Sequence, residues 1–124
     1  MATMMLGVYV LCFAAGATNH LRDFLARGPR PYAGVPLPLE VFWSALLFLD
    51  LCVVVLLLGG RRRAGLALAA AVMIADVAAN TTATVLLRWE IGWALVLQSL
   101  FLGFVVGSLP LLWPRGVGRW RRNA

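Results

Sequence analysis

Two carboxylates, Asp50 and Asp76, lie in stretches that otherwise contain almost only apolar side chains. An ionisable side chain in hydrocarbon is costly, so one that is kept there usually faces a protein interior and has a role. Two carboxyl groups in one low-dielectric site do not both ionise easily, so we expect at least one to be protonated at neutral pH. The pair therefore predicts acid–base or proton-carrying chemistry, with Asp50 and Asp76 as candidate catalytic residues.

Other polar residues gather toward one end of the same stretches. Asn80 and Thr84 follow Asp76 at spacings of four, which places the three side chains on one face of a helix. A second stripe with helical spacing runs from Glu40 through Trp43 to Asp50. Facing stripes predict a polar pocket that is open at one end and packed closed at the other. The candidate ligand-binding residues are Asn19, His20, Asp23, Glu40, Trp43, Asn80, Thr84 and Gln98.

Structural roles also account for several of these residues. A buried aspartate can hydrogen-bond a neighbouring membrane helix, and threonine hydroxyls often bond to their own backbone. His20 can pair with Asp23, three residues later, and Trp43 can belong to an interfacial aromatic belt. Gly103 and Gly107 form a GxxxG pattern, which favours close helix contact within the bundle or in a homodimer.

The elements that must position these residues are membrane helices. The chain is 62% hydrophobic and its mean hydropathy is +0.88, and a bilayer core of about 30 Å requires roughly 20 apolar residues per helix. Four stretches qualify, at about 4–24, 39–59, 64–87 and 91–113. We therefore expect an all-α integral membrane protein that forms one up-and-down four-helix bundle over residues 1–124.

The arginines predict the orientation of this bundle. An even number of spans places both termini on one side, where seven arginines lie, against four on the other side, and the chain has no lysine. The positive-inside rule then makes both termini cytoplasmic, as expected for a bacterial cytoplasmic membrane. The net charge of +6 indicates contact with anionic membrane lipid and excludes nucleic-acid binding as its main purpose. Tryptophans 43, 89 and 93 are expected at the outer interface, and tryptophans 113 and 120 at the inner one.

A signal peptide is the alternative for the first span. The stretch "AAGATNH" offers a small-residue cleavage site at residues 15–17, but the leader "MATMML" lacks a basic segment. We expect the span to be retained, and cleavage would leave three helices.

Thiol and metal chemistry have little support. Cys12 and Cys52 have no C-x-x-C spacing, so we expect two small buried apolar side chains, with a redox pair as the alternative. The chain shows no metal-ligand spacing and no cofactor motif. We expect neither a metal nor a cofactor.

The order of these features resembles the EXPERA domain of the emopamil-binding sterol isomerase and its receptor-like relatives. The shared layout is a first helix ending in Asp23, a proline-rich loop, and a second helix with an acid within "FWSALLFLDLCVV". The resemblance implies a membrane bundle that encloses a sterol or lipophilic amine, with Asp50 and Asp23 as its acids. The histidine and glutamate that the isomerases carry one turn apart are missing. In addition, Pro38-x-Glu40 resembles a short motif of membrane lycopene cyclase subunits.

Three functions remain open from the sequence. The first is a pocket for a sterol- or isoprenoid-like ligand, in a binding protein or a proton-transfer isomerase or cyclase. The second is a small proton-coupled multidrug exporter acting as a homodimer, although such exporters carry a glutamate in the first helix, which is uncharged here until its outer end. The third is a non-enzymatic assembly subunit whose polar groups join helices.

Overall fold

Four helices make up the computed structural model, which describes residues 1–116 and has no strand in that range. Each helix is long and apolar enough to cross a membrane. The predicted four-helix membrane bundle is therefore confirmed, with bounds that differ from the predicted spans by a few residues. The helices are α1 (Ala2–Arg27), α2 (Leu37–Leu58), α3 (Arg62–Leu86) and α4 (Trp93–Leu112).

Glycine and proline set the helix limits. α1 is followed by Gly28, which adopts a positive φ of 84°. α2 follows Pro36, and a proline in its first turn removes one of the backbone N–H groups that would have no acceptor within the helix. The tight connection from α2 to α3 contains Gly60 at a φ of 76°. These breaks leave the 28–36 segment as the one long connection between the described helices.

Large apolar side chains cover the outside of the bundle. In water such a surface would promote aggregation, whereas lipid tails solvate it. This pattern is that of an integral membrane protein, with α1 to α4 all contributing to the apolar exterior. Examples from the four helices are Leu11, Phe48, Ile74 and Leu100.

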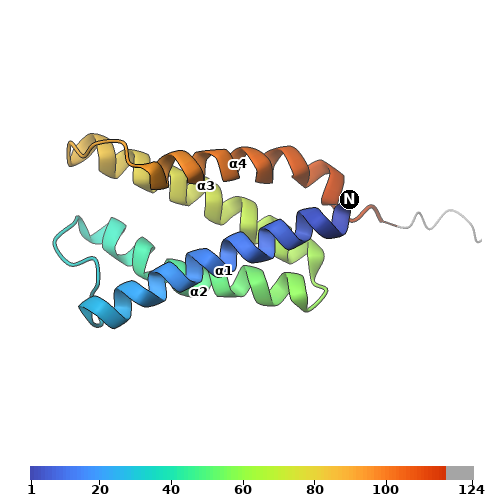
Figure 1. Cartoon of the computed structure of the whole chain (residues 1–124), viewed down its shortest axis with the longest axis horizontal. Helices are drawn as coiled ribbons and strands as arrows, with labels where there is room; N and C mark the ends of the chain where they lie inside the picture. The colour runs from blue at the N-terminus through green and yellow to red at the C-terminus, as the bar shows by residue number, and fades with distance from the viewer. Residues whose placement is uncertain (117–124) are drawn as a thin grey trace, which may run out of the picture.

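The helices pack in sequence, with α1 on α2, α2 on α3 and α3 on α4, while α1 and α4 have the smallest contact. Figure 1 shows the α1–α2 pair separating from the α3–α4 pair toward the end that carries the 28–36 and 87–92 connections. We call this end the pocket end. The opposite end, which holds the N-terminus and the Gly59–Gly60 turn, is the closed end.

At the closed end α1 is locked to α4. The Tyr9 hydroxyl donates to the backbone carbonyl of Val105 at 3.0 Å and lies 2.9 Å from Ser108 Oγ. One turn further along, the Phe13 ring meets Phe101 edge-on, with centroids 5.6 Å apart. This half of the bundle is packed shut, as the sequence predicts. Its fully buried side chains include Tyr9, Val53, Leu66, Ala69 and Val105.

The arginine distribution follows from this topology. The 61–63 turn and Arg115 lie at the closed end, and Arg22, Arg27, Arg30 and Arg88 lie at the pocket end. The cytoplasmic location of the closed end stays a prediction. Arg119, Trp120, Arg121 and Arg122, which were part of that prediction, lie outside the described residues.

Two small-residue features face outward. Cys12 and Cys52 are free and exposed, so the expectation that they are buried is wrong. Gly103 and Gly107 are exposed too, and an added Cβ at either would meet nothing within 4 Å. The GxxxG pattern therefore plays no part in packing within the bundle, and the homodimer through these glycines stays a prediction.

The closest approach of α1 to α2 depends on Gly16. A Cβ at this position would lie 2.5 Å from Asp50 Oδ2 and 3.4 Å from Asp50 Cγ. Such a separation is well inside van der Waals contact, so only glycine leaves room for the buried carboxyl group. By contrast, Gly7 on the same helix has nothing within 4 Å of an added Cβ.

We expect Gly16→Val to destabilise the protein by about 1–3 kcal/mol, because the larger side chain overpacks the α1–α2 contact at Asp50. The measurement is unfolding in detergent micelles followed by tryptophan fluorescence. Gly7→Val is the matched control and should leave the unfolding curve nearly unchanged. If both variants lose equal stability, the close packing of Gly16 on Asp50 is not the cause.

Candidate functional site

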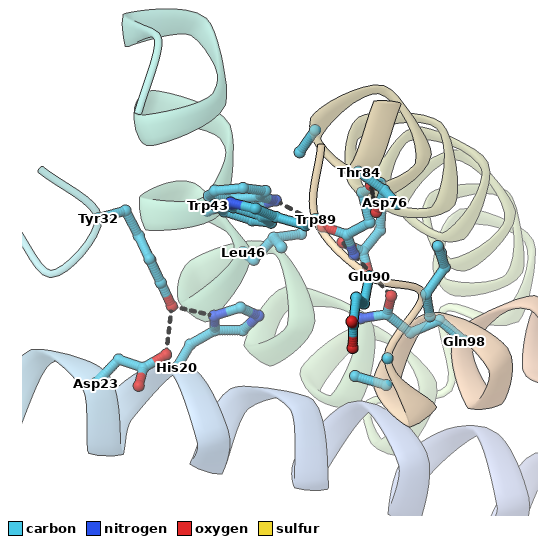
Figure 2. Close-up of a pocket in the computed structure, with 15 residues that line it drawn as sticks. His20, Asp23, Tyr32, Trp43, Leu46, Asp76, Thr84, Trp89, Glu90 and Gln98 are labelled. Atoms are coloured by element: carbon cyan, nitrogen blue, oxygen red, sulfur yellow. Dashed lines mark hydrogen bonds between the residues drawn. The ribbon is translucent and has the colours of Figure 1, made fainter. Parts of the chain in front are cut away.

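A cavity of about 410 Å³ opens at the pocket end and receives side chains from all four helices (Figure 2). Its volume lies within the range of small-molecule sites. Most of its wall is apolar or aromatic, with polar groups from α1, α3 and α4. The lining residues are His20, Asp23, Tyr32, Trp43, Leu46, Asp76, Asn80, Ala83, Thr84, Trp89, Glu90, Gly92, Ala94, Leu95 and Gln98.

The Asn80 side chain is the centre of the α3–α4 wall. Its Oδ1 accepts a hydrogen bond from Trp43 Nε1 at 2.9 Å. Its Nδ2 donates to Asp76 Oδ1 at 3.0 Å and to Gln98 Oε1 at 2.6 Å. One amide thereby joins α2, α3 and α4, and both of its N–H donors are used. We call these four residues the Asn80 cluster.

The opposite wall is built on the end of α1. Tyr32, from the 28–36 connection, donates its hydroxyl hydrogen to Asp23 Oδ2 at 2.8 Å, and the same oxygen lies 2.7 Å from His20 Nδ1. Figure 2 shows Tyr32 reaching from the connection to both α1 side chains. Burial and the bond to Asp23 raise the pKa of Tyr32, so its hydroxyl stays protonated at neutral pH.

Aromatic rings connect the two polar walls. Trp43 and Trp89 stack with centroids 6.2 Å apart and an interplanar angle of 18°, and the Tyr32 ring meets Trp43 edge-on at 5.8 Å. Trp43 is only 8% exposed. It therefore forms part of the pocket wall. Stacked indoles offer an electron-rich face to an apolar or cationic group.

Seven of the ten residues selected from the sequence line the cavity. Thr84 is among them, but its hydroxyl donates to the Asn80 backbone carbonyl at 2.8 Å, the structural role that was the alternative for threonine. His20 and Asp23 also come together, with the Tyr32 hydroxyl inserted between them. The seven residues are His20, Asp23, Trp43, Asp76, Asn80, Thr84 and Gln98.

Three selected residues lie outside the lining. Asp50 is buried against Gly16 on the α1 side of α2. Glu40 is buried in a bidentate ion pair with Arg30, at 2.7 and 2.9 Å, and so fastens the 28–36 connection to α2. Asn19 is exposed on α1.

Among the lining residues that the sequence did not reveal, Tyr32, Trp89 and Glu90 carry aromatic or charged side chains. All three come from connections, whose path periodicity does not predict. One feature of the sequence pointed to Tyr32. It is the one tyrosine in a proline-rich segment, and this segment follows a helix whose last two turns contain His20 and Asp23.

The ionisable groups around the cavity are mostly acidic. Asp23, Asp76 and Glu90 line it, and His20 is the one lining side chain that can become cationic. Within residues 1–116, no three histidine, cysteine, aspartate or glutamate side chains gather to hold a metal ion. The arrangement suits a ligand that brings a hydrogen-bond donor or a positive charge into an otherwise apolar space.

No protein-family model matches this chain, and no curated protein or solved structure is found that matches it.

We expect Asn80→Leu to break the Asn80 cluster, because leucine has a similar volume but neither donates nor accepts hydrogen bonds. The Trp43 indole N–H then loses its acceptor, and its proton resonance should move upfield and exchange faster with water in the ¹H–¹⁵N NMR spectrum. Each lost bond is worth about 0.5–1.5 kcal/mol.

Thr84→Val is the control for this experiment. Its hydroxyl lines the same wall but bonds to the backbone, so the Trp43 resonance should stay in place. If the Trp43 indole N–H resonance has the same position and exchange rate in Asn80→Leu as in the parent protein, the hydrogen bond between the two side chains is contradicted.

Access to the cavity can be measured with cysteine labelling. In a background with Cys12→Ala and Cys52→Ala, we expect a membrane-impermeant maleimide to label Thr84→Cys at the mouth, and Val72→Cys, buried toward the closed end, to resist labelling. Intact spheroplasts and inverted vesicles then report the orientation. Labelling at position 84 in inverted vesicles only would reverse the predicted topology.

Proposed function

We propose that this protein binds a lipophilic small molecule in the pocket-end cavity. The apolar body of the ligand lies against Trp43, Leu46 and Leu95, and its polar group meets the Asn80 cluster at Asp76. The observation that carries the proposal is a fixed hydrogen-bonded cluster set into an aromatic cavity of about 410 Å³. Ligand sites combine an apolar wall with a few convergent polar groups in this way.

Asp76 is the group most available to the ligand. Asn80 donates to its Oδ1, which leaves Oδ2 for an O–H or N–H donor. The neighbouring amides are less free, since both Asn80 donors and the Gln98 carbonyl oxygen are already bonded. The mostly apolar and aromatic wall around this carboxyl group favours a sterol- or isoprenoid-like compound.

Proton-transfer catalysis is an extension of this proposal. A protonated Asp76 would donate its proton to one carbon of an olefin, and the stacked indoles of Trp43 and Trp89 would stabilise the resulting carbocation. The Asp76 carboxylate would then take a proton from a neighbouring carbon, which forms the new double bond and restores the acid. The EXPERA and lycopene cyclase resemblances favour isomerisation or cyclisation. Asp50 lies outside the lining, so in this scheme it acts on Asp76 through charge and not on the ligand.

Two other functions remain alternatives. A proton-coupled exporter would use Asp76 and Asp50 as its proton sites, because their carboxylates interact electrostatically. It would drive a cationic dye out of proteoliposomes under a pH gradient, and Asp76→Asn would abolish this transport. A non-enzymatic assembly subunit would need the Asn80 cluster for folding alone and would bind no lipophilic ligand.

The central test is ligand quenching of Trp43 and Trp89. The protein, with Trp93, Trp113 and Trp120 changed to phenylalanine, is placed in phosphatidylcholine nanodiscs and titrated with a brominated prenyl alcohol and a brominated alkylamine. We expect saturable quenching. Asp76→Asn should weaken binding by about tenfold or more, since the asparagine keeps the shape and the Asn80 contact but removes the charge.

Asp50→Asn is the matched control, because it makes the same change in a buried carboxyl group outside the lining. Its affinity should stay within about twofold of the parent protein. Equal losses in the two variants would indicate that the acids act as one unit. Quenching that rises linearly with either probe and never saturates would sink the ligand-binding proposal.

A further inference from the structure

The contact between α1 and the 28–36 connection fixes where one proton lies. Tyr32 has a single hydroxyl hydrogen, and its hydroxyl donates this hydrogen to Asp23 Oδ2. The 2.7 Å contact between His20 Nδ1 and the same hydroxyl oxygen must then be a hydrogen bond in which the imidazole donates. His20 therefore carries its proton on Nδ1.

The consequence concerns the other ring nitrogen. A neutral imidazole has one N–H, so a proton on Nδ1 leaves Nε2 with an open lone pair. Figure 2 shows that the ring edge carrying this nitrogen faces away from Tyr32 and toward the cavity. Within residues 1–116 no hydrogen-bond partner of Nε2 is found. The α1 wall therefore presents a hydrogen-bond acceptor.

We propose that His20 Nε2 is a second ligand-binding group, held as an acceptor by Tyr32 and Asp23, and that it selects ligands carrying an O–H or N–H donor. Tyr32 and Asp23 are positioning residues, since they act through His20. The inference rests on the proposed ligand-binding function and adds which head-group chemistry the cavity accepts.

The surroundings of His20 agree with this assignment. From its own helix it faces Asp23, from the connection Tyr32, and across the cavity lie Asp76 and Glu90. None of these groups donates a hydrogen bond to Nε2 in the structure. Acceptors on both walls suit a donor-bearing head group between them and disfavour an ether of the same size, which would leave the acceptors unpaired.

The proton position can be observed directly, because His20 is the single histidine of the chain. In protein labelled with ¹⁵N-histidine, the nitrogen shifts distinguish the Nδ1–H and Nε2–H tautomers above the pH at which the imidazole titrates. We expect the Nδ1–H form in the parent protein. Finding the Nε2–H form there would overturn the proposal without any ligand being needed.

Two variants test the positioning. Tyr32→Phe removes the acceptor for Nδ1–H, so the imidazole should revert toward the Nε2–H form. Asp23→Leu frees the Tyr32 hydroxyl to donate to Nδ1, which should move the proton to Nε2 completely. Either variant serves if the other fails to fold, and an unchanged tautomer in a folded variant would contradict the assignment.

Tyr9→Phe is the matched control, because Tyr9 is the only other tyrosine and its hydroxyl is hydrogen-bonded at the closed end. It loses comparable bonds far from the cavity. Its His20 nitrogen shifts should equal those of the parent protein.

Ligand selection is read in the quenching assay with the brominated alkylamine, whose ammonium group has N–H donors for both Asp76 and His20 Nε2, and with its N,N-dimethyl derivative, which keeps a single N–H. The parent protein should prefer the primary amine by about fivefold to tenfold, and Asp23→Leu should reduce this preference to about twofold or less while binding of the dimethyl derivative is maintained. Binding of both probes with equal affinity in the parent protein would refute the inference alone. Absence of any saturable binding would refute the proposed function.

Discussion

The hydrogen bonding of Asn80 is the constraint on which the pocket end depends. In hydrocarbon an amide needs a partner for each of its polar atoms, and this amide finds them on three helices, at Trp43, Asp76 and Gln98. The bonds to Trp43 and Gln98 fix the rotation of α2 and α4 relative to α3 at one level, and the bond to Asp76 orients the amide within α3. The aromatic wall follows, since Trp43 is held where it can stack on Trp89.

The two ends of the bundle solve the burial of polar groups differently. At the closed end, the Tyr9 hydroxyl is satisfied by Val105 and Ser108, and apolar packing surrounds it. At the pocket end, the polar groups bond to one another but keep open valences toward a cavity, as with Asp76 Oδ2 and His20 Nε2. Apolar packing is therefore concentrated in one half, and the other half holds the cavity in which we propose that a ligand binds.

The sequence predicted the four helices and much of the site. Span length and hydropathy identify membrane helices because the bilayer sets both, and helical spacing correctly placed Asp76, Asn80 and Thr84 on one face. Asp50 is buried, but its position along α2 does not tell which neighbour the side chain meets, and it lies against Gly16 and outside the cavity lining.

The sequence also could not predict where the connections between helices pack, because helical spacing gives no contacts between elements. Glu40 was expected in the pocket because of its stripe on α2, whereas Arg30 captures it from outside. Tyr32 could not be assigned to His20 and Asp23 without knowing where the 28–36 segment returns. Periodicity describes one helix at a time, and contacts between a loop and a helix lie beyond it.

The connections also determine which pairs of helices are held together at the pocket end. At the pocket end the 28–36 segment straps α1 to α2, through both Tyr32 and the Arg30–Glu40 pair. The 87–92 segment joins α3 to α4, and the Trp43–Asn80 bond closes the α2–α3 side. Only the seam between α1 and α4 lacks such a strap there among the described residues, while Tyr9 holds it together at the far end. At the pocket end the α1–α4 contact is therefore the least constrained of the four contacts between helices.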